Sequence, residues 1–261
     1  VEEFSDRDVD WGFGDLSWVT FKRSYSREGE AWWETCRRVI EGMFTVQRIH
    51  CLERGLPWDE EKARRFAREA YRRMFDFKWT PPGRGLWIMG TDFVYERGGA
   101  ALNNCGFVST RSIDEDYAEP FEWMMVMSML GVGVGFDTRG RGDVTITEAE
   151  RVDETFTVGD SREGWAEAVG RLLRAYTDGA SIPEWDFSEI RPEGTPLESF
   201  GGYASGPKPL ADLLDDLEAV HDAYVGEVAD SRLIVDTMNL IGRCVVAGGI
   251  RRVPAPGGRS R

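Results

Sequence analysis

Apolar residues recur every three or four positions in several long stretches of the chain, which is the spacing of helices that bury one face. The first stretch begins near Glu30 and carries Trp33, Cys36 and Ile40 on its expected inner face. Asp59 precedes the next stretch and is a suitable N-cap for it. The pattern predicts helices over residues 30–51, 59–75, 120–130, 160–176, 207–224 and 231–246.

Shorter apolar runs between these helices predict strands. One lies at residues 104–110, and another at residues 131–136, where glycine and valine alternate. That alternation favours a strand whose backbone is closely approached, because the GxGxxG spacing of a dinucleotide loop is missing. Further strands are expected at residues 144–147 and 185–190. Helices alternating with short strands indicate an α/β fold behind a helical amino-terminal region.

Residues 80–92 interrupt the helical pattern with prolines and glycines. Proline removes a helical hydrogen bond and glycine weakens a helix interior, so we expect no regular helix in this segment. The carboxyl-terminal residues 253–261 also lack apolar periodicity and are rich in proline, glycine and arginine. We expect them to form an irregular tail that is foreign to the preceding fold.

The charge balance narrows the classes of partner. The net charge is −14, from 46 acidic and 32 basic side chains, which argues against nucleic acid and against an anionic membrane surface. No run approaches the roughly 18 apolar residues of a membrane span, and the acidic start is unlike a signal peptide. We therefore expect a cytoplasmic protein, and a small phosphorylated ligand stays compatible with the charge.

The four cysteines lie far apart in the sequence, with no CxxC pair and only two histidines. A zinc site needs closely spaced ligands, so no metal site is expected. Cys36 and Cys244 have apolar neighbours and are predicted to fill the core. His221 lies beside Asp222 and is expected at the surface. Cys105 is either a buried filler or a redox-active thiol, and the local pattern leaves both open.

Two segments are candidates for binding an anion. Gly201, Gly202, Ser205 and Gly206 lie just before a predicted helix, where free backbone amides bind phosphate groups well. A flexible turn is an equally good interpretation of the same residues. The Arg251–Arg252 pair ends the last predicted helix, and it is either a solvated helix end or an anion clamp.

A series of short motifs runs in a fixed order along residues 25–252. They are PPGRGLW at 81–87, MGTDFV at 89–94, ALNNC at 101–105, GVGF at 133–136, DSREGW at 160–165, DFSEIRP at 186–192, FGGYASGP at 200–207, NLIG at 239–242 and GGIRR at 248–252. Each motif is modest alone, but their joint presence in order is highly specific. Together they resemble the adenosylcobalamin-dependent (class II) ribonucleoside-triphosphate reductases of the monomeric type.

The resemblance implies a domain plan. Residues 1–100 would form the mostly helical amino-terminal region. Residues 101–252 would form the first part of a ten-stranded α/β barrel, including an insertion that holds the deoxynucleotide (dNTP) effector. The barrel would be truncated in this chain, because the family's radical cysteine and second redox cysteine have no match here. We expect a frameshifted, intein-interrupted or partial gene product that is inactive alone.

The resemblance also implies the chemistry. Adenosylcobalamin would generate a thiyl radical on the family's radical cysteine, and a separate cysteine pair would reduce the ribonucleoside triphosphate substrate. Cys105 matches one member of that pair, with Asn104 beside it as a substrate-side residue. A thioredoxin-like partner would then reduce the resulting disulfide, and a complementing C-terminal chain would supply the missing half. The alternatives are a non-catalytic effector-binding module, half of a split enzyme, or an inert structural domain.

Overall fold

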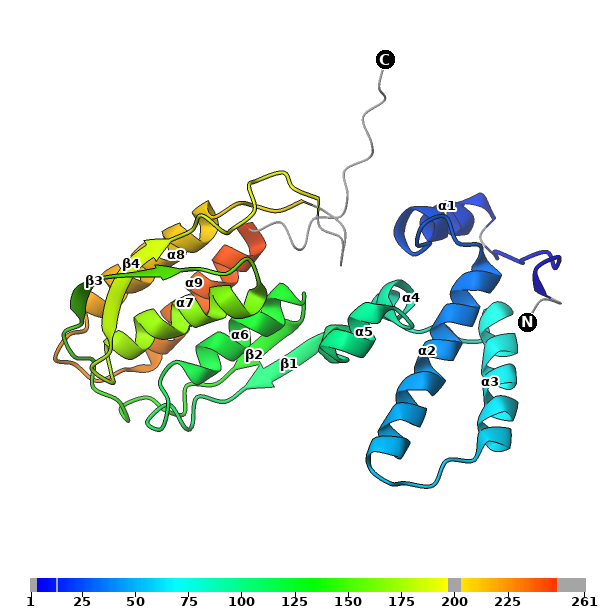
Figure 1. Cartoon of the computed structure of the whole chain (residues 1–261), viewed down its shortest axis with the longest axis horizontal. Helices are drawn as coiled ribbons and strands as arrows, with labels where there is room; N and C mark the ends of the chain where they lie inside the picture. Colours follow the sequence, from blue (N-terminus) through cyan, green and yellow to red (C-terminus); the bar gives the residue numbers. More distant parts are fainter. Residues whose placement is uncertain (1–3, 13, 197–202, 248–261) are drawn as a thin grey trace, which may run out of the picture. The chain divides into compact units, whose positions relative to one another are not determined.

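The computed structural model of the chain describes residues 4–12, 14–196 and 203–247 (Figure 1). The chain divides into two compact units, Val1–Leu102 and Asn103–Arg261. We describe each unit by itself. Within the described residues, no helix is both long enough and apolar enough to cross a membrane.

The first unit is helical. Its largest part is a hairpin of two long helices, α2 and α3, which pack against each other. Aromatic side chains fill the core between them and the amino-terminal segment, with Phe21 packed edge-on against Trp32 at 5.4 Å between ring centroids. The elements are α1 (Asp15–Ser24), α2 (Trp32–Glu53), α3 (Glu60–Phe75), α4 (Gly83–Ile88), α5 (Asp92–Arg97) and the 3-10 turn η2 (Ala100–Leu102).

Local signals explain where these helices begin. The Asp59 side chain accepts a hydrogen bond from the Lys62 N–H, so the predicted N-cap of α3 is confirmed. The expectation of no regular helix over residues 80–92 was wrong, since the six-residue helix α4 forms within this segment. A second six-residue helix, α5, begins at its last residue, Asp92. Pro82 stands at the N-cap of α4, outside the helix, where its missing N–H breaks no helical bond.

The second unit mixes helices with parallel strands. Its elements are β1 (Cys105–Val108), α6 (Glu119–Met129), β2 (Gly133–Phe136), β3 (Glu150–Thr157), α7 (Arg162–Ala175), β4 (Ser181–Asp186), α8 (Lys208–Asp222) and α9 (Ser231–Ala247). Helix α6 connects β1 to its parallel partner β2, and α7 connects β3 to its parallel partner β4. Each is a β–α–β unit, because parallel strands need a long crossover. The described residues of the second unit therefore have an α/β fold.

The helices α6, α7, α8 and α9 pack around one apolar core, with the two strand pairs at separate edges of the unit (Figure 1). Cys244 is 4% exposed in this core, and Cys36 is fully buried in the core of the first unit. Both predictions of core cysteines are confirmed. His221 is also fully buried, so its expected surface position was wrong.

Two strand predictions need correction. The strand expected at residues 185–190 lies earlier, at β4, because Ser188 bonds back to the Asp186 side chain and starts a turn. The strand expected at residues 144–147 is only an isolated bridge between Thr145 and Val228. Strand β3 was not predicted, because only Val152 and Phe156 of its eight residues are even half-buried.

Candidate functional site

Cys105 opens β1 on an accessible face of the strand pair. Exposed and half-buried residues alternate along β1, which places Cys105 and Phe107 on one face and Gly106 on the other. Cys105 is paired with Gly133, and the Gly133 N–H donates to the Asn104 carbonyl at 2.9 Å. Because a glycine stands opposite, no side chain from β2 covers the thiol at that position.

The other three cysteines are in different surroundings. All four lie in the described part of the chain and are unpaired, but only Cys105 is exposed. Burial raises the pKa of the Cys36 thiol, and it raises the pKa of Cys244 to about 12. A buried thiol that stays protonated is a poor nucleophile. Cys51 is half-buried near the end of α2. Cys105 is therefore the thiol best placed to react.

The inner face of β1 packs against α6. A methyl group added at Gly106 would lie 3.1 Å from the Trp123 ring and 3.4 Å from Val132. These distances leave little room for any side chain larger than hydrogen at this position. The close contact keeps β1 against α6 and directs Cys105 to the opposite, open face.

Asp137 ties together the ends of β1 and β2. Its Oδ1 accepts from the Thr110 N–H at 2.9 Å, and its Oδ2 accepts from the Ser109 hydroxyl at 2.9 Å. Desolvation works in the opposite direction, but these hydrogen bonds lower the pKa of the Asp137 carboxyl. The Gly140 N–H completes this cluster by donating to the Thr110 hydroxyl at 3.3 Å. We call these four residues the strand-end clamp.

The strand-end clamp was missed in the sequence. A signal was present, because Ser109 and Thr110 directly follow β1 and Asp137 directly follows β2. Short polar side chains at the ends of two neighbouring parallel strands lie at the same edge and bond to nearby backbone groups. The pairing could not be recognised before it was known that these two strands are neighbours.

The predicted anion-binding residues are only partly described. Ser205 and Gly206 precede α8, and Gly206 has a φ of 70°, which a glycine adopts without strain. Their end of α8 lies well apart from β1 in Figure 1. Gly201, Gly202 and the Arg251–Arg252 pair lie outside the described residues.

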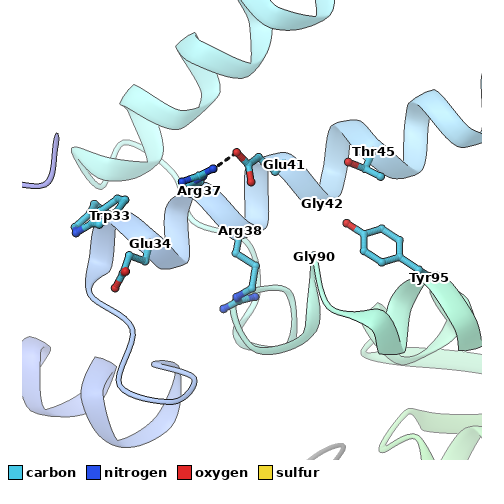
Figure 2. Close-up of a pocket in the computed structure, with 9 residues that line it drawn as sticks. All are labelled: Trp33, Glu34, Arg37, Arg38, Glu41, Gly42, Thr45, Gly90 and Tyr95. Carbon is cyan, nitrogen blue, oxygen red and sulfur yellow. Dashed lines mark hydrogen bonds and ion pairs between the residues drawn. The ribbon is translucent and has the colours of Figure 1, made fainter. Parts of the chain in front are cut away.

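The first unit contains a cavity of about 380 Å³ along α2. Figure 2 shows its lining, in which Arg37 is paired with Glu41 and Tyr95 reaches toward α2 from α5. The lining residues are Trp33, Glu34, Arg37, Arg38, Glu41, Gly42, Thr45, Gly90 and Tyr95. Its charged side chains are of both signs, so the cavity has no clear preference for an anion or a cation.

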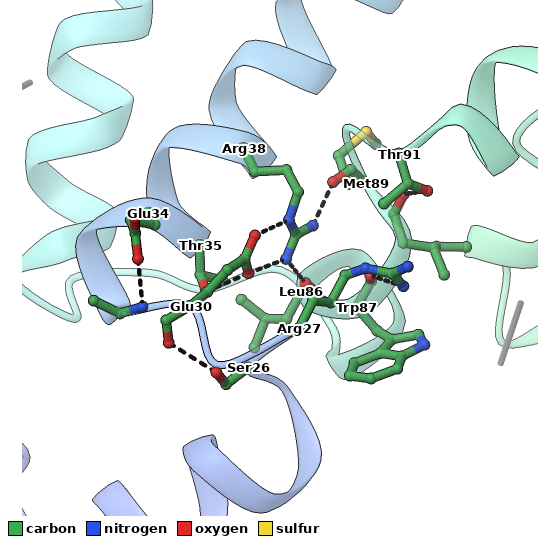
Figure 3. A network of polar contacts seen from close by, with 12 residues as sticks. Ser26, Arg27, Glu30, Glu34, Thr35, Arg38, Leu86, Trp87, Met89 and Thr91 are labelled. Carbon is green, nitrogen blue, oxygen red and sulfur yellow. Dashed lines mark hydrogen bonds and ion pairs between the residues drawn. The ribbon is translucent and has the colours of Figure 1, made fainter. Parts of the chain in front are cut away.

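Arg38, at the edge of this cavity, has a structural role. Its guanidinium forms two hydrogen bonds with Glu30, at 2.7 and 2.9 Å, and donates to the Leu86 and Met89 carbonyls (Figure 3). Burial opposes ionisation of Glu30, but the Arg38 partner lowers the pKa of that carboxyl. The pair therefore holds the α4 segment against α2 and leaves little capacity for a ligand.

Two family models match separate parts of the chain. The model described as the ribonucleotide reductase alpha domain matches residues 1–91. The model described as the insertion domain of B12-dependent ribonucleotide reductase matches residues 139–221. The second match contains β3, α7, β4 and nearly all of α8.

Two relatives from different organisms have the same protein name. The adenosylcobalamin-dependent ribonucleoside-triphosphate reductase of Euglena gracilis is 42% identical over 97% of this chain and 36% of its own length. The protein of that name from Lacticaseibacillus paracasei is 31% identical over 92% of this chain and 40% of its own length. The chain thus spans somewhat more than a third of these relatives.

A solved structure agrees with the sequence matches. The crystal structure of a B-12 dependent (class II) ribonucleotide reductase superposes with a TM-score of 0.80 at 30% identity, over 95% of this chain and 43% of that chain. The fold, the ordered motifs, the family models and the relatives all indicate the same family. The chain belongs to the family of adenosylcobalamin-dependent, class II ribonucleoside-triphosphate reductases.

Proposed function

We propose that the chain is the amino-terminal part of a reductase that converts ribonucleoside triphosphates to 2′-deoxyribonucleoside triphosphates. Within that enzyme, Cys105 is one of the two reducing thiols. The single observation that carries this role is the exposed thiol on the open face of β1, opposite Gly133. We infer that the β1–β2 pair belongs to the first part of the ten-stranded barrel implied by the motifs.

The reduction balances with two thiols. The C2′–O bond of the ribose breaks, a C2′–H bond forms, and the hydroxyl leaves as water. The two cysteines supply two electrons and two protons and are joined as a disulfide. A reducing thiol must lie beside the substrate and within disulfide reach of its partner, which means a Cα–Cα separation of roughly 4.4–6.8 Å. The open strand face, without a covering side chain, leaves Cys105 accessible to a substrate and to a partner thiol, which supports this role.

Adenosylcobalamin is the cofactor proposed for the complete enzyme, where it supplies the radical that starts the reaction. We assign none of the described residues to hold it. The chain's own contribution is to present Cys105, to supply Asn104 on the substrate side, and to keep Cys36 and Cys244 unreactive by burial.

Deoxynucleotide effector binding is proposed for the region after Phe136. The matched insertion domain supports this, as does its β3–α7–β4 unit, because ligands of such units bind beyond the carboxyl ends of the strands. Ser205 and Gly206, which precede α8, are proposed nucleotide contacts, together with Gly201, Gly202 and the Arg251–Arg252 pair. A thioredoxin-like protein in the cytoplasm is the proposed reductant for the disulfide.

Joining the chain to its downstream coding sequence tests this proposal. The joined protein should reduce ribonucleoside triphosphates only when adenosylcobalamin and a dithiol reductant are both added. The chain alone is the matched control and should show no turnover, because the second reducing thiol is absent from it. A folded joined protein that binds nucleotides and reduces none under these conditions would contradict the reductase function.

A further inference from the structure

The position of Cys105 depends on the register of β1 against β2, and the side chains of β2 specify that register poorly. Glycine and valine alternate from Gly131 to Gly135, so the strand looks much the same after a shift of two residues. A shift of two keeps the same residues on each face, whereas a shift of one would exchange the faces. Glycine-rich strands are the kind in which register slips.

A two-residue slip would displace the thiol while leaving it exposed. Each residue of a strand advances about 3.3 Å, so Cys105 would move roughly 6.6 Å along β2. That displacement is about as large as the greatest Cα–Cα separation that a disulfide spans, since the usual separation is roughly 4.4–6.8 Å. A slipped strand would therefore present a reactive thiol in a place where it cannot reach its partner.

We propose that Asp137 is a positioning residue for Cys105, acting through the strand-end clamp to fix the register of β1 against β2. Its carboxylate bonds to both residues that follow β1, namely Ser109 and Thr110, at 2.9 Å each. Those partners have no repeat in the sequence, unlike the Gly–Val pairs of residues 131–134. The clamp is thus satisfied in one register alone.

The clamp is also rigidly packed. Thr110 is fully buried, and its hydroxyl lies 3.1 Å from Asp137 Oδ1. A methyl group added at Gly140 would lie 2.1 Å from the Thr110 carbonyl oxygen, so the loop after Asp137 is pressed against this residue. Sliding β1 by two residues would break these contacts together, because Thr110 would move out of reach of the carboxylate.

Asp186 provides a matched control. It ends β4 of the other parallel pair and accepts from the Ser188 N–H at 2.9 Å and from the Thr157 hydroxyl at 3.0 Å. Hydrogen bonds lower the pKa of the Asp186 carboxyl, as they do for Asp137. Asp186→Ala therefore removes a similar strand-end carboxylate without touching the strand of Cys105.

Disulfide trapping in this chain reads the register directly. Gly133→Cys places a second thiol opposite Cys105, whereas Gly135→Cys places one two residues further along β2. Glutathione disulfide serves as the oxidant: it accepts two electrons and yields two glutathione molecules while the two protein thiols form one bond. Neighbouring strands lie about 4.8 Å apart, which suits the 133 pair, whereas the 135 pair is about 8 Å apart and beyond reach.

With Asp137 intact, the bond from Cys105 to the cysteine of Gly133→Cys should form at least about ten-fold faster than the bond to the cysteine of Gly135→Cys. Asp137→Ala should reduce that preference to within about three-fold, and Asp186→Ala should leave it unchanged. Peptide mass spectrometry without reduction measures both rates. An unchanged preference in Asp137→Ala, with Cys244 still protected from alkylation, would overturn the proposal.

Cys244 reports on folding in the same experiment, because it is buried in the core of the same unit. If Asp137→Ala exposes Cys244 to alkylation, the double variant Ser109→Ala with Thr110→Val decides instead, since it removes both hydroxyls that contact the Asp137 carboxylate and leaves from the β1 end only a backbone N–H, which any residue supplies. Full register preference in that double variant would then refute the clamp. The consequence for catalysis rests on the proposed function, but trapping needs no turnover, so an inactive joined reductase would leave the register result standing.

Discussion

His221 shows how one buried side chain makes the stability of the second unit depend on pH. Its Nδ1–H donates to the Leu217 carbonyl at 2.8 Å, so its Nε2 accepts from the Tyr117 hydroxyl at 3.1 Å. Both ring nitrogens of the neutral imidazole therefore form hydrogen bonds. Burial lowers the pKa of His221 from 6.5 to about 4, against smaller opposing effects of Leu217 and Asp222.

The lowered pKa predicts a loss of stability in acid. Between pH 6.5 and 4 the unfolded chain binds a proton at this histidine and the folded chain does not, so unfolding becomes easier as pH falls. The stability contributed by neutral, buried His221 is fully present above pH 6.5. As the pH falls, the free energy of unfolding decreases by at most about 1.4 kcal/mol per pH unit. Urea unfolding of the second unit at pH 7 and pH 5 measures it.

His221→Gln should flatten this pH dependence, and His50→Gln is the control, because His50 is exposed on α2 of the other unit. Equal slopes in the parent and in His221→Gln would show that His221 does not cause the loss. The usual unfolded-state pKa values of Asp and Glu lie below pH 5, so carboxylates add little in this window.

The burial of His221 could have been predicted from the sequence, but its neighbour Asp222 led to the wrong expectation. It lies four residues after Leu217 and seven after Leu214, both buried on the inner face of α8. Helical periodicity therefore places it inside, whereas the neighbouring Asp222 suggested the surface. Cys105 is the opposite case: no local pattern separated a reactive thiol from a filler, and only the ordered motifs did so.

At the scale of elements, two helical glycines have opposite surroundings. A methyl group added at Gly42 of α2 would lie 2.4 Å from the Gly90 backbone, where the chain crosses the helix. A methyl group at Gly242 of α9 would meet only the Met124 Cε, at an ordinary 3.8 Å. Alanine is favoured over glycine in a helix by up to about 1 kcal/mol at both sites. Packing therefore decides whether each substitution stabilises or destabilises its unit.

Gly42→Ala should destabilise the first unit by about 1–3 kcal/mol, because backbone atoms cannot yield as a flexible side chain does. Gly242→Ala should leave the second unit unchanged or stabilise it by up to about 1 kcal/mol. Hydrogen exchange in peptides of α2 and α9 reports each unit separately. Stabilisation by Gly42→Ala would contradict the close crossing of α2 with the segment at Gly90.

The elements were predictable where local signals agreed with burial. The long helices and the two strands around α6 follow from periodicity and capping, as at Asp59. Helix α4 was not predicted, because Pro81 and Pro82 were counted as helix breakers although both lie before its first residue. Strand β3 was missed because it is largely exposed and charged, so it lacks the apolar alternation that predicts a strand.

At the scale of the molecule, the chain spans 36% and 40% of its Euglena gracilis and Lacticaseibacillus paracasei relatives. Periodicity predicted the α/β class, whereas the expectation of a barrel and of reductase chemistry rests on the ordered motifs. Long-range strand order is not encoded in local propensity, since it depends on which segments meet in space. The central claim is therefore that Cys105 is a reducing thiol of the complete enzyme.

Turnover of the joined reductase carrying Cys105→Ser tests that claim most directly. With a thioredoxin-type reductant, the account predicts that multiple turnover is abolished while nucleotide affinity is unchanged, because serine cannot form the disulfide. Cys51→Ser, a matched change at a half-buried thiol of the first unit, should retain turnover. Undiminished multiple turnover in Cys105→Ser would contradict the account and remove Cys105 from the mechanism.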